Sequence, residues 1–555
     1  MALILSIYGG HDAAVSIVDD GKVVFNLELE RYTRKKHDYG VSDEFVAFCL
    51  SKAGLSIRDI DYVATNSGLT QWLERSGEKL FPNGLPPCLP HTPRLDSRST
   101  LQPFETDLLG TQLKAYAVQH HLAHAAGAMF TAPFPAHDMV TVTYDGWGDG
   151  SNLSVCLQAN NKFYFMPRNT LKIGDMWSHY TERNYAMPRP DRKIPGSGPG
   201  KIMGLASYGR KKDEIVEMVW EDLPLLDLFP SELASKGFNQ GEDLSDTRQQ
   251  RSADVAHAME LVTTSLVSRV FRRALSLGTR RRYIAYSGGI ALNCVANSAA
   301  WRSSGAEDLY VPPNPNDCGL AMGAGLALHF RGLSKNEAFN GISFSPYLGP
   351  LYSAQEIGEQ LSGLSKHGDF AIAPDAPVDR LVDVIEAGHV VAVFHGRSES
   401  GPRALGHRSL LARPDRPGVR EEVNDRIKLR EWYRPLAPMV LKEHIGELFS
   451  ECVPSSPHMS TVAFFRKDVG DRFPGVCHVD YSCRPQYVDE NSDAFVREVL
   501  TKFHRRTGIP LLLNTSFNRH AAIVETPAHA VEDFLQMPVR FLWLQGNLID
   551  KGQSS

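Results

Sequence analysis

A histidine-rich stretch, Gln119-His120-His121-Leu122-Ala123-His124-Ala125-Ala126, places the strongest constraint on what this chain can form. Alanine, leucine and methionine surround the histidines, and this composition predicts one helix over 113–129. On that helix His120 and His124 are four residues apart and project from one face, a spacing that lets two imidazoles bind one metal ion. A buried helix whose histidines bond to backbone has the same pattern, so the choice depends on the rest of the chain.

The bulk composition excludes several classes of protein. The chain has 555 residues, which is too long for one hydrophobic core, and its net charge of -5 gives no basic field for nucleic acid. The N-terminus lacks a basic leader region, and no run of about 18 apolar residues could span a membrane. Eight cysteines include no CxxC pair, which is typical of reduced thiols. We therefore expect a cytoplasmic protein that binds neither nucleic acid nor membranes.

The first 37 residues predict strands over 2–7, 14–18 and 23–29. The turn Gly9-Gly10-His11-Asp12 presents His11 at a strand end, where the backbone can approach a phosphate. The basic run at 30–37 fits either a solvated edge or an anion clamp. The stretch 82–110 is rich in proline, glycine, serine and threonine and predicts an exposed loop.

A second motif lies at the end of a predicted strand over 139–144. There, carboxylates stand among glycines in the run Asp145-Gly146-Trp147-Gly148-Asp149-Gly150. This pattern suits metal or phosphate chemistry, and a glycine-rich hairpin turn would have the same pattern. The glycines around Lys201 do not form a Walker A loop, because no GK[ST] occurs. Further predicted elements are a helix over 253–277, a strand over 283–286 that ends in Ser287-Gly288-Gly289, and a small-residue helix over 320–328 whose glycines and alanines allow close packing.

The residues 331–378 are rich in serine, glycine and proline and mark a domain boundary. A helix over 378–387 and a strand over 389–394 open the next unit, and a later strand is expected over 510–513. From His395 to Ile445 there are 11 lysines and arginines against 7 acidic residues. Such a concentration around glycine-rich turns indicates an anion or polyphosphate pocket, with surface loop arginines as the alternative.

Taken in order, these motifs resemble the O-carbamoyltransferase family of natural-product and nodulation-factor biosynthesis. The segments that carry the resemblance are residues 10–13, 30–37, 120–125, 145–149, 200–206, 287–289, 401–406, 432–435 and 513–518. The resemblance implies a mixed α/β fold with an actin-like ATPase (Kae1-like) domain over 1–345, a linker over 346–377 and a YrdC-like α/β domain over 378–555.

The same resemblance implies an ATP-dependent enzyme. The C-terminal domain would combine ATP, supplied with Mg, and carbamoyl phosphate into carbamoyl-adenylate, and the N-terminal domain would transfer the carbamoyl group to a hydroxyl of a small-molecule natural product. Lys428 and Arg434 are implied as catalytic, and they need a bend or a strand to converge because they lie six apart. Arg403, Arg484 and Asn514 are implied as further contacts to carbamoyl phosphate and nucleotide.

In the N-terminal domain the resemblance implies His120, His124 and Asp317 as ligands of iron(II) or another divalent metal. Asp145 would be a further ligand or lie beside the intermediate. His11 is expected to be the general base for the acceptor hydroxyl, since imidazole titrates near neutral pH, with a phosphate-binding or capping histidine as the alternative. The expected contacts to carbamoyl-adenylate or AMP are Lys36, Lys201, Gly204 and Gly289.

Two other functions remain open at this point. A tRNA threonylcarbamoylation enzyme uses the same two folds, although the fusion of both domains in one acidic chain stands against it. An actin-like ATP-binding scaffold without transfer chemistry is the other. The sequence leaves the acceptor and the oligomeric state open, a homodimer being one compatible assembly, and we expect the 80–110 loop to shape acceptor specificity.

Overall fold

The chain divides into two compact units in the computed structural model. The first comprises Met1–Lys22, Tyr39–Asp43 and Ile60–Ser343, and the second comprises Val23–Asp38, Glu44–Asp59 and Phe344–Ser555. The described residues are 2–66, 88–89, 92–93, 95–96, 99–159, 162–184, 199–225, 246–277, 281–333, 344–364, 368 and 370–552. The expected loop at 82–110 therefore lies partly outside them, and its last part is not a loop, because Leu101–Leu108 form a strand that pairs with Thr111–Val118.

Two segments differ from the domain division expected from the sequence. Most of 23–59 belongs to the second unit although it lies near the N-terminus. The stretch 346–377, expected to be a linker, is part of the second unit and contains helix α11 (Ala354–Leu364) and strand β12 (Ala371–Ala373). Ile357 and Leu364 are buried and seven apart, so one face of α11 packs into the core of this unit.

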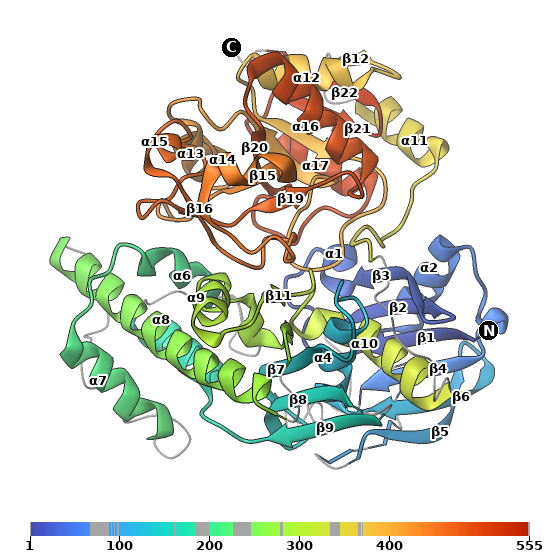
Figure 1. Cartoon of the computed structure of the whole chain (residues 1–555). Helices are drawn as coiled ribbons and strands as arrows, with labels where there is room; N and C mark the ends of the chain where they lie inside the picture. Colours follow the sequence, from blue (N-terminus) through green and yellow to red (C-terminus); the bar gives the residue numbers. More distant parts are fainter. Residues whose placement is uncertain are drawn as a thin grey trace. The chain divides into compact units, whose positions relative to one another are not determined.

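The first unit contains two mixed sheets of related topology. One has the order β2-β1-β4-β6-β5, and the other has the order β9-β8-β7-β10-β11. In the first sheet β1 pairs antiparallel with β2, and on its other side β4 and β6 follow in parallel. In the second sheet β7 pairs antiparallel with β8, and on its other side β10 and β11 follow in parallel. Figure 1 shows β7, β8 and β9 side by side. The strands are β1 (Leu3–Tyr8), β2 (Ala14–Asp19), β4 (Tyr62–Asn66), β5 (Leu101–Leu108), β6 (Thr111–Val118), β7 (Met139–Gly148), β8 (Ser151–Ala159), β9 (Lys162–Arg168), β10 (Tyr283–Ser287) and β11 (Asp308–Tyr310).

Helix α10 crosses helix α4 at close range. A Cβ added at Gly323 of α10 would lie 1.9 Å from the carbonyl oxygen of Ala123 in α4, so only glycine permits this backbone approach. The close packing expected of the small-residue helix is confirmed, and it brings the start of α10 to the first turns of α4. The helices of this unit are α4 (His120–Met129), α5 (Ile173–Asn184), α6 (Pro199–Ala206), α7 (Asp213–Asp222), α8 (Asp246–Leu275), α9 (Cys294–Ser304) and α10 (Leu320–Ala327).

The predicted helix over 113–129 is wrong in its first part. Residues Thr111–Val118 form strand β6, which pairs with β4 and β5, and the helix begins only at His120. Alternating burial along β6 fits a strand with one covered face, and the Gln119 side chain accepts a hydrogen bond from Leu122 N as the helix cap. The predicted strands over 2–7, 14–18 and 23–29 are confirmed within two residues.

The second unit is built on a mixed sheet with the order β12-β22-β21-β13-β14-β20-β15-β19, beside a small sheet β16-β17-β18. Helices α12 and α16 pack against each other, and α16 also contacts β15 and β20. The elements are β3 (Lys22–Glu28), α1 (Leu29–Thr33), α2 (Asp43–Ala53), α12 (Val378–Glu386), β13 (Val391–Phe394), β14 (Arg408–Ala412), α13 (Val419–Glu421), β15 (Ala437–Leu441), α14 (Ile445–Leu448), β16 (Phe449–Glu451), β17 (Ala463–Phe465), α15 (Lys467–Gly470), β18 (Ser482–Cys483), β19 (Gln486–Val488), α16 (Ala494–Thr507), β20 (Leu511–Ser516), α17 (Pro527–Gln536), β21 (Phe541–Leu544) and β22 (Asn547–Asp550).

Helices and strands alternate in both units, which confirms the predicted α/β class. Among the described helices, none combines the length and the apolar character that crossing a bilayer requires.

Candidate functional sites

Two histidines and two aspartates meet in the first unit. His120 and His124 lie in the first turns of α4, Asp145 lies near the end of β7, and Asp317 lies just before α10. One ligand atom from each lies within 4.8 Å of the others, and all four residues are buried. His120 Nε2 is 3.2 Å from Asp145 Oδ2, and His124 Nε2 is 3.3 Å from Asp317 Oδ1.

This group of atoms fits a divalent cation. His124 Nε2 is buried and, despite the nearby Asp317, makes no hydrogen bond of acceptable geometry. Burial lowers the pKa of His120, but Asp317, Asp145 and Asp149 raise it more, to about 9. The aspartates therefore bring negative charge that neutral imidazoles do not balance and that a cation would balance. Two imidazole nitrogens and carboxylate oxygens are ligands that iron(II) and similar ions accept.

The loop after β7 positions the histidines. Asp149 Oδ2 accepts a hydrogen bond from His120 N at 2.7 Å, which caps the N-terminus of α4. A Cβ at Gly148 would lie 2.2 Å from the His120 ring, so the glycine makes room for the imidazole. Asp145 Oδ1 accepts from Gly289 N at 2.5 Å, which ties this carboxylate to the loop after β10. The motif at 145–150 thus orients the candidate metal ligands.

His11 lies at the edge of the same group. Its Nε2 is 3.3 Å from Asp317 Oδ2 and its Nδ1 is 3.2 Å from Asp12 Oδ2, while 36% of its side chain is exposed. Burial lowers the pKa of His11, but Asp317 and Asp12 raise it more, to about 10. A cation that shares Asp317 would offset this effect. His11 is therefore the member of the group that combines solvent access with contact to a candidate ligand.

The other expected contacts of this unit are placed less closely together. Gly289 lies beside Asp145, whereas Lys201 and Gly204 lie on α6, which packs against α8. Lys36 belongs to the second unit, with the arginines of the C-terminal segment. His121 points away from the candidate metal ligands, with its Nε2 at 2.9 Å from the carbonyl oxygen of Ser151.

The second unit contains a cluster of positive side chains that we call the cation cluster: Lys36, Lys428, Arg430, Arg434 and Arg484. Burial and the charges of Arg430, Lys36 and Arg434 hold the pKa of Lys428 well below its usual value. Burial and the charges of Arg434 and Arg484 lower the pKa of Arg430 to about 9. Like charges lower each other's pKa only at short range, so these side chains converge on one region.

Several donors of the cation cluster lack a protein acceptor. In the described part of the chain, Arg430 Nη2 and Arg484 Nε are buried without a hydrogen-bond partner. Arg434 has Glu431 Oε2 at 3.4 Å, a long contact for an ion pair. Lys428 Nζ instead donates to Ser516 O, Ser516 Oγ and Asn518 Oδ1 at 2.7–2.9 Å. Buried guanidinium nitrogens without an acceptor, on partly buried cationic side chains, are features of an anion site.

The backbone bends where the sequence required it to bend. A wide helical turn over Glu422–Ile427 precedes Lys428, and Leu429 follows with a φ of +46°. This left-handed conformation breaks the helix between Lys428 and Arg430. Sequence reasoning did not single out Arg430, although it stands between the two implied catalytic residues.

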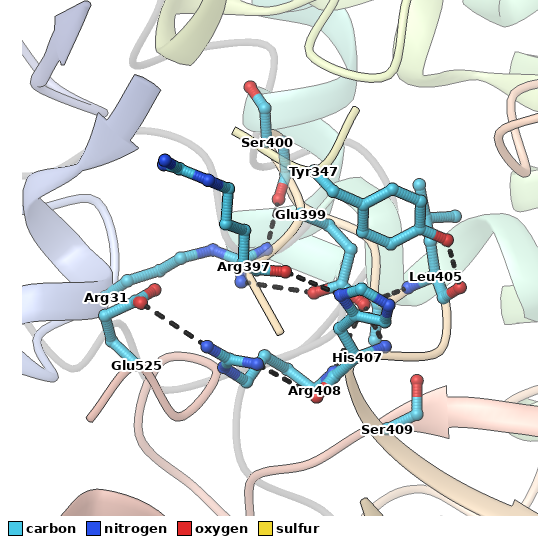
Figure 2. A network of polar contacts seen from close by, with 12 residues as sticks. Arg31, Tyr347, Arg397, Glu399, Ser400, Leu405, His407, Arg408, Ser409 and Glu525 are labelled. Atoms are coloured by element: carbon cyan, nitrogen blue, oxygen red, sulfur yellow. Dashed lines mark hydrogen bonds and ion pairs between the residues drawn. The ribbon is translucent and has the colours of Figure 1, made fainter. Parts of the chain in front are cut away.

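The glycine-rich loop 401–406 is held by hydrogen bonds on several sides (Figure 2). Glu399 Oε1 accepts from the backbone N–H groups of Leu405, His407 and Arg408 at 2.7–3.2 Å. The Tyr347 hydroxyl donates to Leu405 O, and Asn514 Nδ2 donates to Ala404 O and Gln486 Oε1. Asn514 therefore fixes the loop that carries Arg403.

Two buried ion groups support this loop, and sequence reasoning missed them. Arg31 Nη2 donates to Gly401 O at 2.8 Å, Glu28 Oε1 accepts from Gly401 N at 2.7 Å, and the Arg31 Nε lies 3.3 Å from Glu28. Arg408 lies 3.8 Å from Glu525, and both are fully buried. Within the basic run at 30–37, Arg31 and Arg34 thus serve structural contacts, since Arg34 pairs with Asp533 at 2.6 Å.

Replacing Arg31 should destabilise the second unit. Arg31→Met leaves the buried Glu28 and Glu399 carboxylates without their cation, so we expect the free energy of unfolding to fall by about 3–5 kcal/mol in urea titrations. Arg380→Met, which removes an exposed pair with Asp383, should change it by less than about 1 kcal/mol. Equal, small effects of both variants would contradict a structural role for the buried group.

Two protein-family models match this chain. The family model described as the carbamoyltransferase N-terminus matches residues 3–74 and 109–326, and the carbamoyltransferase C-terminus model matches residues 382–551. The chain therefore belongs to the carbamoyltransferase family and is a carbamoyltransferase, as the motifs predicted.

Relatives of similar length support this assignment. Nodulation protein NolNO of Sinorhizobium fredii is 31% identical over 98% of this chain and 80% of its own length. Nodulation protein U of Bradyrhizobium diazoefficiens is 27% identical over 98% of this chain and 96% of its own. An uncharacterized Synechocystis protein is 29% identical over 98% of this chain and 95% of its own length.

Proposed function

We propose that this carbamoyltransferase is ATP-dependent and acts on a hydroxyl of a small-molecule natural product. The second unit would form carbamoyl-adenylate from ATP and carbamoyl phosphate, and the first unit would transfer the carbamoyl group. The observation that carries the proposal is the cation cluster, because buried arginine donors without acceptors suit two polyanionic substrates. The related topology of the two sheets in the first unit supports an actin-like, Kae1-like architecture, and the second unit would be YrdC-like.

The adenylate-forming step needs the negative charges of two substrates, carbamoyl phosphate and ATP, to be neutralised. Water cleaves the phosphate from carbamoyl phosphate, and the carbamate oxygen then attacks the α-phosphorus of ATP-Mg, from which pyrophosphate leaves. Arg434 and Lys428 would hold the two anions close and balance their charge as it redistributes. Arg403 and Arg484 would add contacts, while Asn514 would keep the loop of Arg403 in place. Lys36 would join them, since it lies near Lys428.

The transfer step would use the metal-binding group of the first unit. His120, His124, Asp145 and Asp317 would hold iron(II) or another divalent ion, which supplies a Lewis acid for a substrate oxygen. His11 would take the proton of the acceptor hydroxyl as its oxygen attacks the carbamoyl carbon, and AMP leaves. Gly289, Lys201 and Gly204 are proposed contacts to the adenylate. The geometry that supports His11 is its exposure beside Asp317.

Replacing His11 should separate the two reactions. We expect His11→Asn to lower carbamoyl transfer by about 100-fold or more, because the acceptor proton loses its base, while adenylate formation keeps its wild-type rate. Product chromatography of AMP, adenylate and carbamoylated acceptor measures both steps. His137→Asn, an exposed histidine of the same unit, should leave both rates unchanged. A parallel loss of both steps in His11→Asn would refute the division of labour.

A further inference from the structure

A buried tyrosine, Tyr8, makes a hydrogen bond to the candidate metal ligand Asp317. Tyr8 is the last residue of β1, and its hydroxyl donates to Asp317 Oδ2 at 2.7 Å. Only 5% of Tyr8 and 3% of Asp317 are exposed, so water does not compete for this hydrogen bond. Neither the motifs nor the proposed transfer step uses Tyr8.

The two oxygens of Asp317 face different partners. Oδ1 lies 3.3 Å from His124 Nε2 and 3.9 Å from His120 Nε2, on the side where the candidate ligand atoms gather. Oδ2 lies 2.7 Å from the Tyr8 hydroxyl and 3.3 Å from His11 Nε2. The hydrogen bond from Tyr8 therefore occupies the oxygen that is turned away from His124.

Gly10 fits this position of the tyrosine. A Cβ at Gly10 would lie 2.3 Å from the Tyr8 hydroxyl oxygen and 2.6 Å from the ring carbon that bears it. A glycine is thus needed because the phenol passes over the turn 9–12. The face of Gly10 that a Cβ would cover is therefore filled by Tyr8.

We propose that Tyr8 is a positioning residue that restricts Asp317 to binding the metal ion through Oδ1 alone. This inference rests on the metal site of the proposed function. A carboxylate held at one oxygen keeps a coordination position open for a substrate oxygen, whereas a free carboxylate can close it with its second oxygen. Partners of this kind, one shell beyond the ion, orient its ligands and tune its affinity.

The test uses the full-length protein and cobalt(II) alone as the probe. Cobalt(II) absorbs visible light with an intensity that reports its coordination number, so it shows geometry as well as affinity. Tyr8→Phe keeps the ring over Gly10 and removes only the hydroxyl. We expect its cobalt(II) Kd to rise about tenfold or more, because Asp317 is no longer oriented toward the ion. Its visible absorption should weaken, because the freed carboxylate binds through both oxygens and raises the coordination number.

A matched control and a second variant make the test specific. Tyr310→Phe removes another buried tyrosine hydroxyl, which donates to Thr131 Oγ1, and should bind cobalt(II) as the wild type does. Gly10→Ala displaces the Tyr8 hydroxyl without removing it. Its loss of affinity should equal that of Tyr8→Phe, and the double variant should lose no more than either single variant.

The outcomes separate this inference from the proposed function. Wild-type affinity and spectrum in Tyr8→Phe, or an equal loss in Tyr310→Phe, would overturn the role of Tyr8 while the metal site stands. A wild-type protein that binds no cobalt(II) would overturn the metal site itself. Loss in Tyr8→Phe and Gly10→Ala, with Tyr310→Phe unchanged, is the result that we expect.

Discussion

Arg434→Ala should abolish carbamoyl-adenylate formation. Removing one guanidinium from the cation cluster leaves the charge of two polyanionic substrates unbalanced, and loss of one such group lowers the rate by about 100–1,000-fold. The variant should not unfold, because Arg434 lies among other cations and its removal relieves their repulsion. Pyrophosphate release measures the rate, and urea titration measures stability.

Two other arginine variants make this result interpretable. Arg434→Lys keeps the charge but loses the two-pronged geometry, so we expect partial recovery of the rate. Arg540→Ala removes a surface arginine paired with Asp550 in the same unit and should keep the wild-type rate. If adenylate forms at the wild-type rate in Arg434→Ala, the assignment of this chemistry to the cation cluster fails.

The double variant His120→Ala/His124→Ala should empty the metal site. The two imidazoles supply half of the four residues whose ligand atoms converge, and the carboxylates alone leave a poor site for iron(II). We expect metal content by elemental analysis to fall to background, and carbamoyl transfer to fall with it. Adenylate formation, which we assign to the second unit, should persist.

The neighbouring histidine provides the control for this experiment. His121→Gln changes a buried histidine on the same helix that faces the carbonyl oxygen of Ser151, so its metal content should match that of the wild type. A double variant that retains a full complement of metal would show that His120 and His124 are not the ligands.

Short-range sequence patterns predicted much of the fold. The strands near the N-terminus followed from their apolar runs and the small-residue helix α10 from its glycines and alanines, and both predictions are confirmed. The start of α4 did not follow, because Leu113 and its neighbours are as compatible with a helix as with a strand. Only pairing of β6 with β4 and β5 decides for the strand.

The candidate sites show a similar division. His120 and His124 stand out by their spacing, and the family resemblance added Asp145 and Asp317 from distant segments; the structure brings all four together. Tyr8, by contrast, looks like an ordinary strand residue until Asp317 is seen beside it. The pairing of Arg31 with Glu399 also joins segments far apart in the chain, which no local pattern reveals.

The most direct test of the proposed function is product analysis with ATP-Mg and carbamoyl phosphate in the absence of any acceptor. Phosphorus NMR distinguishes the products. We predict pyrophosphate together with phosphate and carbamoyl-adenylate or its hydrolysis product AMP, formed only when carbamoyl phosphate is present. ADP and phosphate, formed with or without carbamoyl phosphate, would contradict adenylate chemistry and indicate an ATPase.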